Sequence, residues 1–207
     1  MKSSKVSPLQ AINKREQVIK TTGKLFLYFG LAAISVLFLC FSGTFVYHMV
    51  MAPAQSIQLP SVFHISTLVI IASSVLLQYM LKLMVSGDNK YFSLMALGVF
   101  MLGTCFLACQ FVGWQMLLQR GIDITSTTAA SYLYLLSGLH ALHLLVGLLA
   151  LGVVAARSLL RLNNPVGQLM FETDVFRQYR ISLLATYWHF VGLLWIYLYI
   201  IFIVVSW

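Results

Sequence analysis

The sequence predicts an all-α fold: an integral membrane five-helix bundle with its N-terminus inside and its C-terminus outside. Three observations predict this fold. Hydrophobic residues make up 60% of the 207 residues and charged residues only 9%, whereas about a quarter of the residues in a soluble domain are charged. The hydrophobic residues are collected in long runs, and the basic residues lie at the ends of these runs.

Five hydrophobic runs are each long enough to cross a bilayer, which takes about 20 residues in a helix. A secretory signal has a shorter apolar stretch followed by a small-residue cleavage site, so we expect the first run to remain as an anchor. We predict a basic cytoplasmic tail at residues 1–24 and a membrane domain at residues 25–207, with helices at approximately 25–50, 61–85, 92–118, 129–156 and 181–206.

The connections between the runs carry turn-forming residues, as expected between helices. Pro53 and Pro60 bracket the first loop, and residues 86–89 form the second turn. Glycine and aspartate at 121–123, followed by a Ser/Thr cluster at 125–128, mark the third. The Asn-Asn-Pro sequence that starts at Asn163 opens a longer polar loop.

The distribution of Lys and Arg predicts the orientation. If the five runs cross the membrane in alternation, all 13 Lys and Arg residues except Arg120 fall on the side of the N-terminus. Positive residues favour the cytoplasmic side, so that side is predicted to be the inner one. The net charge of +8 then reflects topology, and we expect no nucleic-acid partner.

The acidic residues all lie outside the centres of the hydrophobic runs. They are Glu16, Asp88, Asp123, Glu172 and Asp174. A carboxylate inside the membrane commonly marks a path for ions or protons. Its absence from the runs argues against a pump or an ion-coupled transporter.

Histidine is the main polar residue type within the runs, at His48, His64, His140, His143 and His189. His140 and His143 share one helix face because they are three residues apart. Histidine is a common axial ligand of haem, but two residues so placed cannot hold opposite faces of one iron. The alternatives are a membrane haem protein that pairs histidines from different helices, and packing histidines that hydrogen-bond to neighbouring groups.

Cysteine and aromatic residues suggest packing roles. Cys105 and Cys109 lie one turn apart in the middle of a run and are expected to pack as small hydrophobic residues, with no metal bound. Trp188 and Trp195, seven residues apart, line one face of the last run. We expect that face to be a packed helix interface or a groove for an acyl chain.

Four stretches of sequence occur in an order that resembles subunit III of the haem–copper terminal oxidases, the cytochrome c and quinol oxidases. Residues 187–195, YWHFVGLLW, are similar to the family's Y/F-W-H-F-x-D-x-x-W, and residues 138–147, GLHALHLLVG, to its G-x-H-G-x-H-V-x-x-G. Residues 97–110 with Trp114, and the stretch from Thr67 to Ser74, complete the resemblance. The chain looks like the five-helix form found in bacteria.

The resemblance implies a non-catalytic accessory subunit in the bacterial inner (plasma) membrane. Such a subunit packs on the catalytic subunit I, contacts other oxidase subunits, and binds structural phospholipid. Haem and copper are then expected on partner subunits and none on this chain, and membership of a larger respiratory supercomplex stays open. A partner of another respiratory complex, such as a nitric oxide reductase, is an alternative.

The resemblance also implies roles for particular residues. His140, His143 and His189 would orient helices through hydrogen bonds, and Gly138, Gly147 and Gly192 would permit close helix approach. The remaining positions of the structural motif are Gln110, Trp114, Trp188 and Trp195. Arg157 and Arg161 are candidates to hold a lipid phosphate, because the guanidinium group binds phosphate through two hydrogen bonds; plain positive-inside signalling is the alternative.

The chain departs from the family pattern at three positions. The family commonly has carboxylates inside the membrane at three positions. In this chain the first position lies near Ser35, and the other two are Gly113 and Gly192. Loss of all three indicates a role in packing, lipid binding and assembly rather than in proton handling.

Overall fold

The part of the protein that the structure describes consists of five long helices. The computed structural model describes residues 8–51, 58–86, 88–162 and 175–206. The helices are α1 (Pro8–Met51), α2 (Val62–Ser86), α3 (Asn89–Gln119), α4 (Thr128–Leu162) and α6 (Val175–Ser206). All five are long and apolar enough to cross a membrane, and the described ranges contain no strand. The prediction of an all-α protein with five membrane-spanning helices is confirmed.

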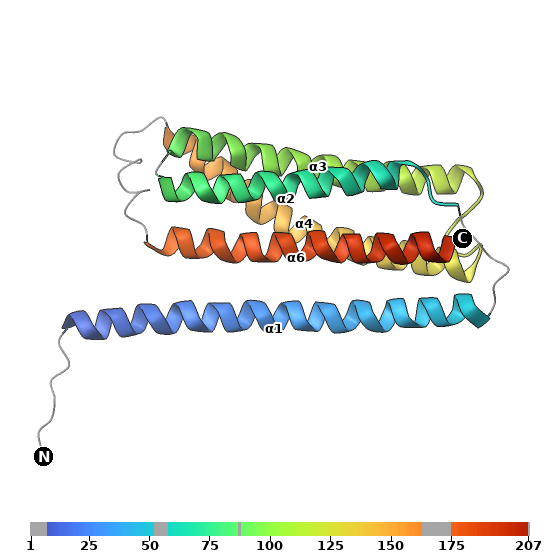
Figure 1. Ribbon diagram of the computed structural model, residues 1–207, viewed down its shortest axis with the longest axis horizontal. Helices are drawn as coiled ribbons and strands as arrows, with labels where there is room; N and C mark the ends of the chain where they lie inside the picture. The colour runs from blue at the N-terminus through green and yellow to red at the C-terminus, as the bar shows by residue number, and fades with distance from the viewer. Residues whose placement is uncertain (1–7, 52–57, 87, 163–174, 207) are drawn as a thin grey trace, which may run out of the picture.

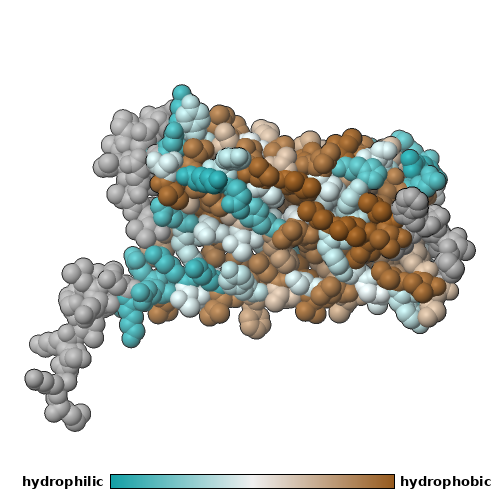
Figure 2. All heavy atoms as spheres, in the orientation of Figure 1, coloured by the Kyte–Doolittle hydropathy of each residue, from teal (hydrophilic) through white to brown (hydrophobic). Residues whose placement is uncertain are grey.

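Four of the helices form a closed bundle, and the fifth lies outside it. In the bundle α2 packs on α3, α3 on α4, α4 on α6, and α6 back on α2. Helix α1 runs along the outside and contacts α4 and α6 (Figure 1). Figure 2 shows hydrophobic residues over much of one face, with hydrophilic residues gathered mainly toward the end at which α1 begins.

Residues at the helix ends explain where α3 and α4 begin and end. Asp88 precedes α3, and its carboxylate accepts a hydrogen bond from the backbone N–H of Tyr91. After α3, Gly121 has a φ of 74°, which suits a residue without a Cβ. The N–H groups of Gly121 and Ile122 bond back to the carbonyls of Leu118 and Leu117, which is the Schellman arrangement. Thr127 caps α4 by accepting from the N–H of Ala130.

The helices extend beyond the hydrophobic runs at the end where α1 starts. Helix α1 begins at Pro8, within the segment predicted as a tail, while α4 continues to Leu162 and α6 begins at Val175. Hydropathy reports the part of a helix that lies in hydrocarbon, and polar residues can continue the same helix into the headgroup region and water. Within this extension the Tyr179 hydroxyl donates to the backbone carbonyl of Lys20 across 2.8 Å, which joins α6 to α1.

Candidate functional site

Two tryptophans of α6 connect it to α2. Trp188 and Trp195 are both almost completely buried. The indole N–H of Trp188 donates to the Ser73 hydroxyl across 3.1 Å, and that of Trp195 donates to the Thr67 hydroxyl across 3.0 Å. Since a buried indole needs a partner for its N–H, these two bonds set the rotation of α6 against α2. The face predicted from the spacing of the tryptophans is a packed helix interface.

A second pair of hydrogen bonds connects α3 to its two neighbours. The side-chain amide of Gln110 donates to the Ser66 hydroxyl on α2 across 3.2 Å. The indole N–H of Trp114 donates to the Ser137 hydroxyl on α4 across 3.0 Å. Helix association in lipid depends on close packing and on such interhelical hydrogen bonds, because moving an apolar side chain from hydrocarbon into a helix interface gives no hydrophobic driving force.

His140 is fully enclosed by the bundle and makes no side-chain hydrogen bond with the described residues. Its side chain is 0% exposed, and its ring centroid lies 5.1 Å from that of Trp195 and 5.8 Å from that of Phe106. Neither ring nitrogen has a hydrogen-bond partner within the described residues. Among the described residues the ring contributes through aromatic packing, and the expectation that His140 orients helices through hydrogen bonds stays a prediction.

The other two motif histidines do make hydrogen bonds. Nδ1 of His143 donates to the carbonyl of Leu139 on its own helix across 2.7 Å, and the backbone carbonyl of His143 accepts from the Tyr187 hydroxyl of α6 across 2.8 Å. Nε2 of His189 lies 2.7 Å from the side-chain amide nitrogen of Gln78 on α2. Of the three predicted helix-orienting rings, only that of His189 bonds to a different helix.

The three motif glycines differ in what surrounds them. A Cβ at Gly147 would lie 2.9 Å from the ring of Tyr187, so close helix approach does require glycine there. A Cβ at Gly192 would lie 3.3 Å from the Ser74 hydroxyl, which is a tight contact. A Cβ at Gly138 would meet nothing within 4 Å. The predicted close approach at Gly138 is therefore wrong within this chain.

The positions at which the family pattern has carboxylates are filled differently. At Gly113 a Cβ would lie 3.0 Å from the ring of Phe63, so the Phe63 ring occupies the space of a side chain. Ser35 bonds to the carbonyl of Leu31 on its own helix across 2.9 Å. Gly192 lines an open space.

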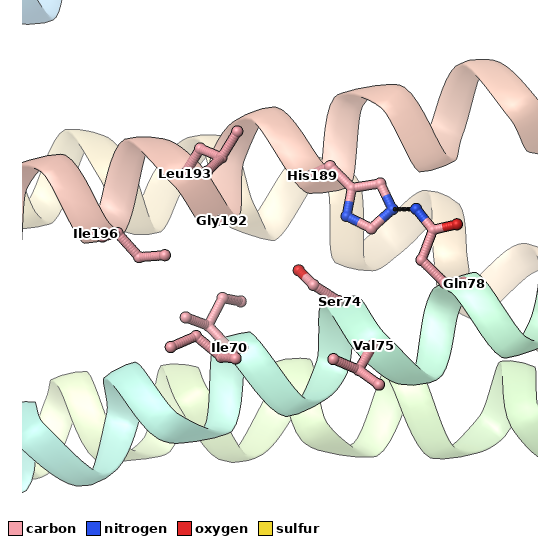
Figure 3. Close-up of a pocket in the computed structure, with 9 residues that line it drawn as sticks. Ile70, Ser74, Val75, Gln78, His189, Gly192, Leu193 and Ile196 are labelled. Carbon is pink, nitrogen blue, oxygen red and sulfur yellow. Dashed lines mark hydrogen bonds between the residues drawn. The ribbon is translucent and has the colours of Figure 1, made fainter.

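That space is a groove between α2 and α6, close to the middle of both helices (Figure 3). Its volume is about 360 Å³. Hydrophobic side chains form most of its wall, and Ser74, Gln78 and His189 supply the polar groups. Gly192 lines the groove from α6 and adds no side chain to it. We define this feature as the α2–α6 groove; it is lined by Ile70, Ile71, Ser74, Val75, Gln78, His189, Gly192, Leu193 and Ile196.

The remaining candidate residues lie apart from this groove. Arg157 is exposed near the end of α4, and the side chain of Arg161 lies outside the described residues. His48 has its ring near that of Tyr132, and Nδ1 of His64 forms a hydrogen bond with the Tyr199 hydroxyl. In the ranges that the structure describes, no three His, Cys, Asp or Glu residues come together in a group that could hold a metal ion.

Sequence reasoning missed the tyrosines of α6 as residues that link helices. The Tyr197 hydroxyl lies 2.7 Å from that of Ser42 on α1, Tyr199 bonds to His64 on α2, and Tyr187 bonds to α4. Their spacing within the aromatic-rich α6 was the available signal. It was not decisive, because tyrosines near a helix end also favour the membrane interface.

Comparison with known proteins identifies the family. The sequence model of the family described as "Cytochrome c oxidase subunit III" matches residues 24–207. A protein of Corynebacterium diphtheriae named "Cytochrome c oxidase subunit 3" is 33% identical over 138 residues, which cover 65% of this chain and 60% of that protein.

Two further relatives match part of the chain. A protein of Mycobacterium bovis named "Probable cytochrome c oxidase subunit 3" is 30% identical over 134 residues, which cover 64% of this chain and 61% of that protein. A protein of Yarrowia lipolytica, also named "Cytochrome c oxidase subunit 3", is 29% identical over 120 residues, which cover 56% of this chain and 39% of that protein. The matched region thus spans less than two thirds of these relatives. Since the family match covers nearly the whole chain, this protein belongs to the cytochrome c oxidase subunit III family.

Proposed function

We propose that this chain is a non-catalytic accessory subunit of a haem–copper terminal oxidase, the enzyme that reduces oxygen to water in aerobic respiration. The observation that carries the proposal is the family match over residues 24–207. Five helices able to cross a membrane agree with it. The chain packs on the catalytic subunit I, which with its partners holds the haem and copper, and stabilises the assembled complex.

The arrangement of polar residues supports a structural role for this subunit. The bonds of Trp188, Trp195, Gln110 and Trp114 each join two helices through neutral groups. Neutral residues also stand at the three positions where the family pattern has carboxylates. We therefore assign this chain to packing and assembly and not to the delivery of protons.

Lipid binding and orientation are further parts of the proposal. Arg157 is exposed close to the end of α4, where a guanidinium group can reach a phospholipid phosphate. The bias of Lys and Arg toward one side supports an orientation with the N-terminus inside and the C-terminus outside, and we propose the bacterial plasma membrane as the location.

Purification of the native complex tests the proposal. A tagged chain is expressed in its own host and isolated in mild detergent, and the co-purifying chains are identified by mass spectrometry and by the haem absorption of the complex. We expect a haem-bearing oxidase subunit in stoichiometric amount. Isolation with a nitric oxide reductase, or a stoichiometric Soret band from this chain alone, contradicts the proposal.

A further inference from the structure

The α2–α6 groove holds polar groups near the middle of two helices that are long and apolar enough to cross a membrane. Ser74 lies midway along α2, and His189 lies near the middle of α6. Figure 3 shows both side chains pointing into the space between the two helices. At this depth the surrounding lipid offers no hydrogen-bond partner, so each polar group must find one in protein.

The Ser74 hydroxyl has no hydrogen bond within the described residues. Its neighbour on the same helix behaves differently. Ser73 donates to the carbonyl of Ile70 across 2.8 Å and accepts from Trp188. Thr67 likewise donates to the carbonyl of Phe63 across 2.8 Å. Serine and threonine in membrane helices usually satisfy the hydroxyl in this way, whereas the Ser74 hydroxyl is turned toward Gly192, at 3.3 Å from the position of a Cβ there.

The imidazole of His189 is also only half satisfied. Its Nε2 pairs with the amide of Gln78. When Nε2 accepts from this amide, the neutral ring carries its proton on Nδ1. In His143 the corresponding nitrogen donates to the carbonyl of Leu139. Nδ1 of His189 has no partner among the described residues and faces the groove (Figure 3).

We propose that the α2–α6 groove is the docking site for a transmembrane helix of a neighbouring subunit, which inserts a hydrogen-bonding side chain between Ser74 and His189. This inference rests on the proposed function as an oxidase subunit. A lipid acyl chain can fill the groove but cannot satisfy the two polar groups. A helix can do both, because small residues such as Gly192 and Ser74 allow close approach and polar side chains supply the interhelical bonds.

Another groove on the chain has no histidine ring in its lining. The groove between α1 and α4 has a comparable volume, about 400 Å³. Its hydroxyl groups at Thr44 and Ser131 are already used: Thr44 donates to the carbonyl of Phe41 across 2.9 Å, and Ser131 donates to that of Ile124 across 2.6 Å. Tyr132 also lines this second groove, and its hydroxyl has no hydrogen bond within the described residues. What distinguishes the α2–α6 groove is that an unpaired hydroxyl and an unpaired ring nitrogen, those of Ser74 and His189, face the same space near the middle of two helices.

Substitution of two adjacent serines tests the proposal in the intact complex. Because the Ser74 hydroxyl has no hydrogen bond within the described residues, Ser74→Ala is expected to leave the unfolding temperature of the isolated subunit unchanged. It should weaken retention of the subunit in the complex by about threefold or more, the effect of one interhelical hydrogen bond. The control Ser73→Ala should lower the unfolding temperature, because Trp188 loses its acceptor. Unchanged retention with Ser74→Ala overturns the proposal.

Site-specific photo-crosslinking identifies the occupant directly. Leu193, at the rim of the groove, is 65% exposed, and Leu149 on α4 is 63% exposed, so benzoylphenylalanine at Leu149 is a matched control. In the native complex, the probe at Leu193 should form an adduct with a membrane helix of another subunit in higher yield than the probe at Leu149. Adducts with lipid or quinone alone, or equal protein yields from both positions, overturn the proposal.

The two proposals fail in different ways. If the chain never co-purifies with a haem-bearing subunit, the proposed function is wrong. If it co-purifies, while Ser74→Ala and the Leu193 probe give the contradicting results, only the docking site is wrong.

Discussion

The ring of Trp188 on α6 occupies the space that a side chain at Gly103 on α3 would need. A Cβ at Gly103 would lie 2.7 Å from Cη2 of Trp188 and 2.8 Å from Cδ1 of Leu148 on α4. The same indole bonds to Ser73 on α2. A Cβ at Gly147 on α4 would lie 3.3 Å from Cε3 of the same ring, so the four helices of the bundle meet at Trp188.

Gly103→Ala is expected to destabilise the subunit. The added methyl group must displace the buried Trp188 ring, and overpacking of a tight interior costs about 1–3 kcal/mol. Gly43→Ala on α1 is the matched control, since its Cβ would meet nothing within 4 Å. Unfolding of the purified subunit in detergent, followed by circular dichroism, measures both variants. Equal stability of the two would show that the ring moves aside without cost.

The bond between Trp195 and Thr67 should give a measurable coupling energy. Thr67→Val removes the acceptor, and Trp195→Phe removes the donor. In a double-mutant cycle we expect a coupling of about 0.6 kcal/mol, and up to about 1.7 kcal/mol, as found for hydrogen bonds between membrane helices. Denaturant unfolding of the wild type, both single variants and the double variant supplies the four free energies. Strict additivity would contradict a stabilising role for this bond.

His140→Leu should retain the stability of the wild type or increase it. The imidazole is 0% exposed, and its two nitrogens have no partner within the described residues. Removal of an unsatisfied buried polar group recovers about 1–3 kcal/mol of desolvation cost, against which the loss of ring packing on Trp195 and Phe106 must be set. The free energy of unfolding decides between these effects. A clear loss of stability would indicate that a buried water satisfies the ring.

Reporter fusions check the orientation. Because the Lys and Arg residues concentrate on one side, a fusion after the C-terminal residue should be active with alkaline phosphatase, which folds outside the cytoplasm. A fusion directly after α4 should instead fluoresce with green fluorescent protein. The opposite pattern would reverse the topology that the positive-inside rule predicts.

The sequence alone determined the number of helices, the turn residues and the family. Hydropathy is a property of each segment by itself, so the five spans could be recognised without knowledge of their neighbours. The turn at Gly121 was likewise predictable, and its φ of 74° gives the reason for glycine there. The predicted starts of α1 and α6 were less accurate, because polar residues continue these helices past the hydrophobic runs to Pro8 and Val175.

Only the tertiary structure decided what each motif residue does. Gly113 and Gly192 stand at equivalent departures from the family pattern, yet Phe63 fills the space beside the first while the second opens into the α2–α6 groove. His140 and His189 looked alike in sequence, yet one is enclosed by aromatic rings and the other bonds to Gln78. These differences depend on how each helix is rotated against its neighbours, and that rotation is set by contacts between residues far apart in the chain.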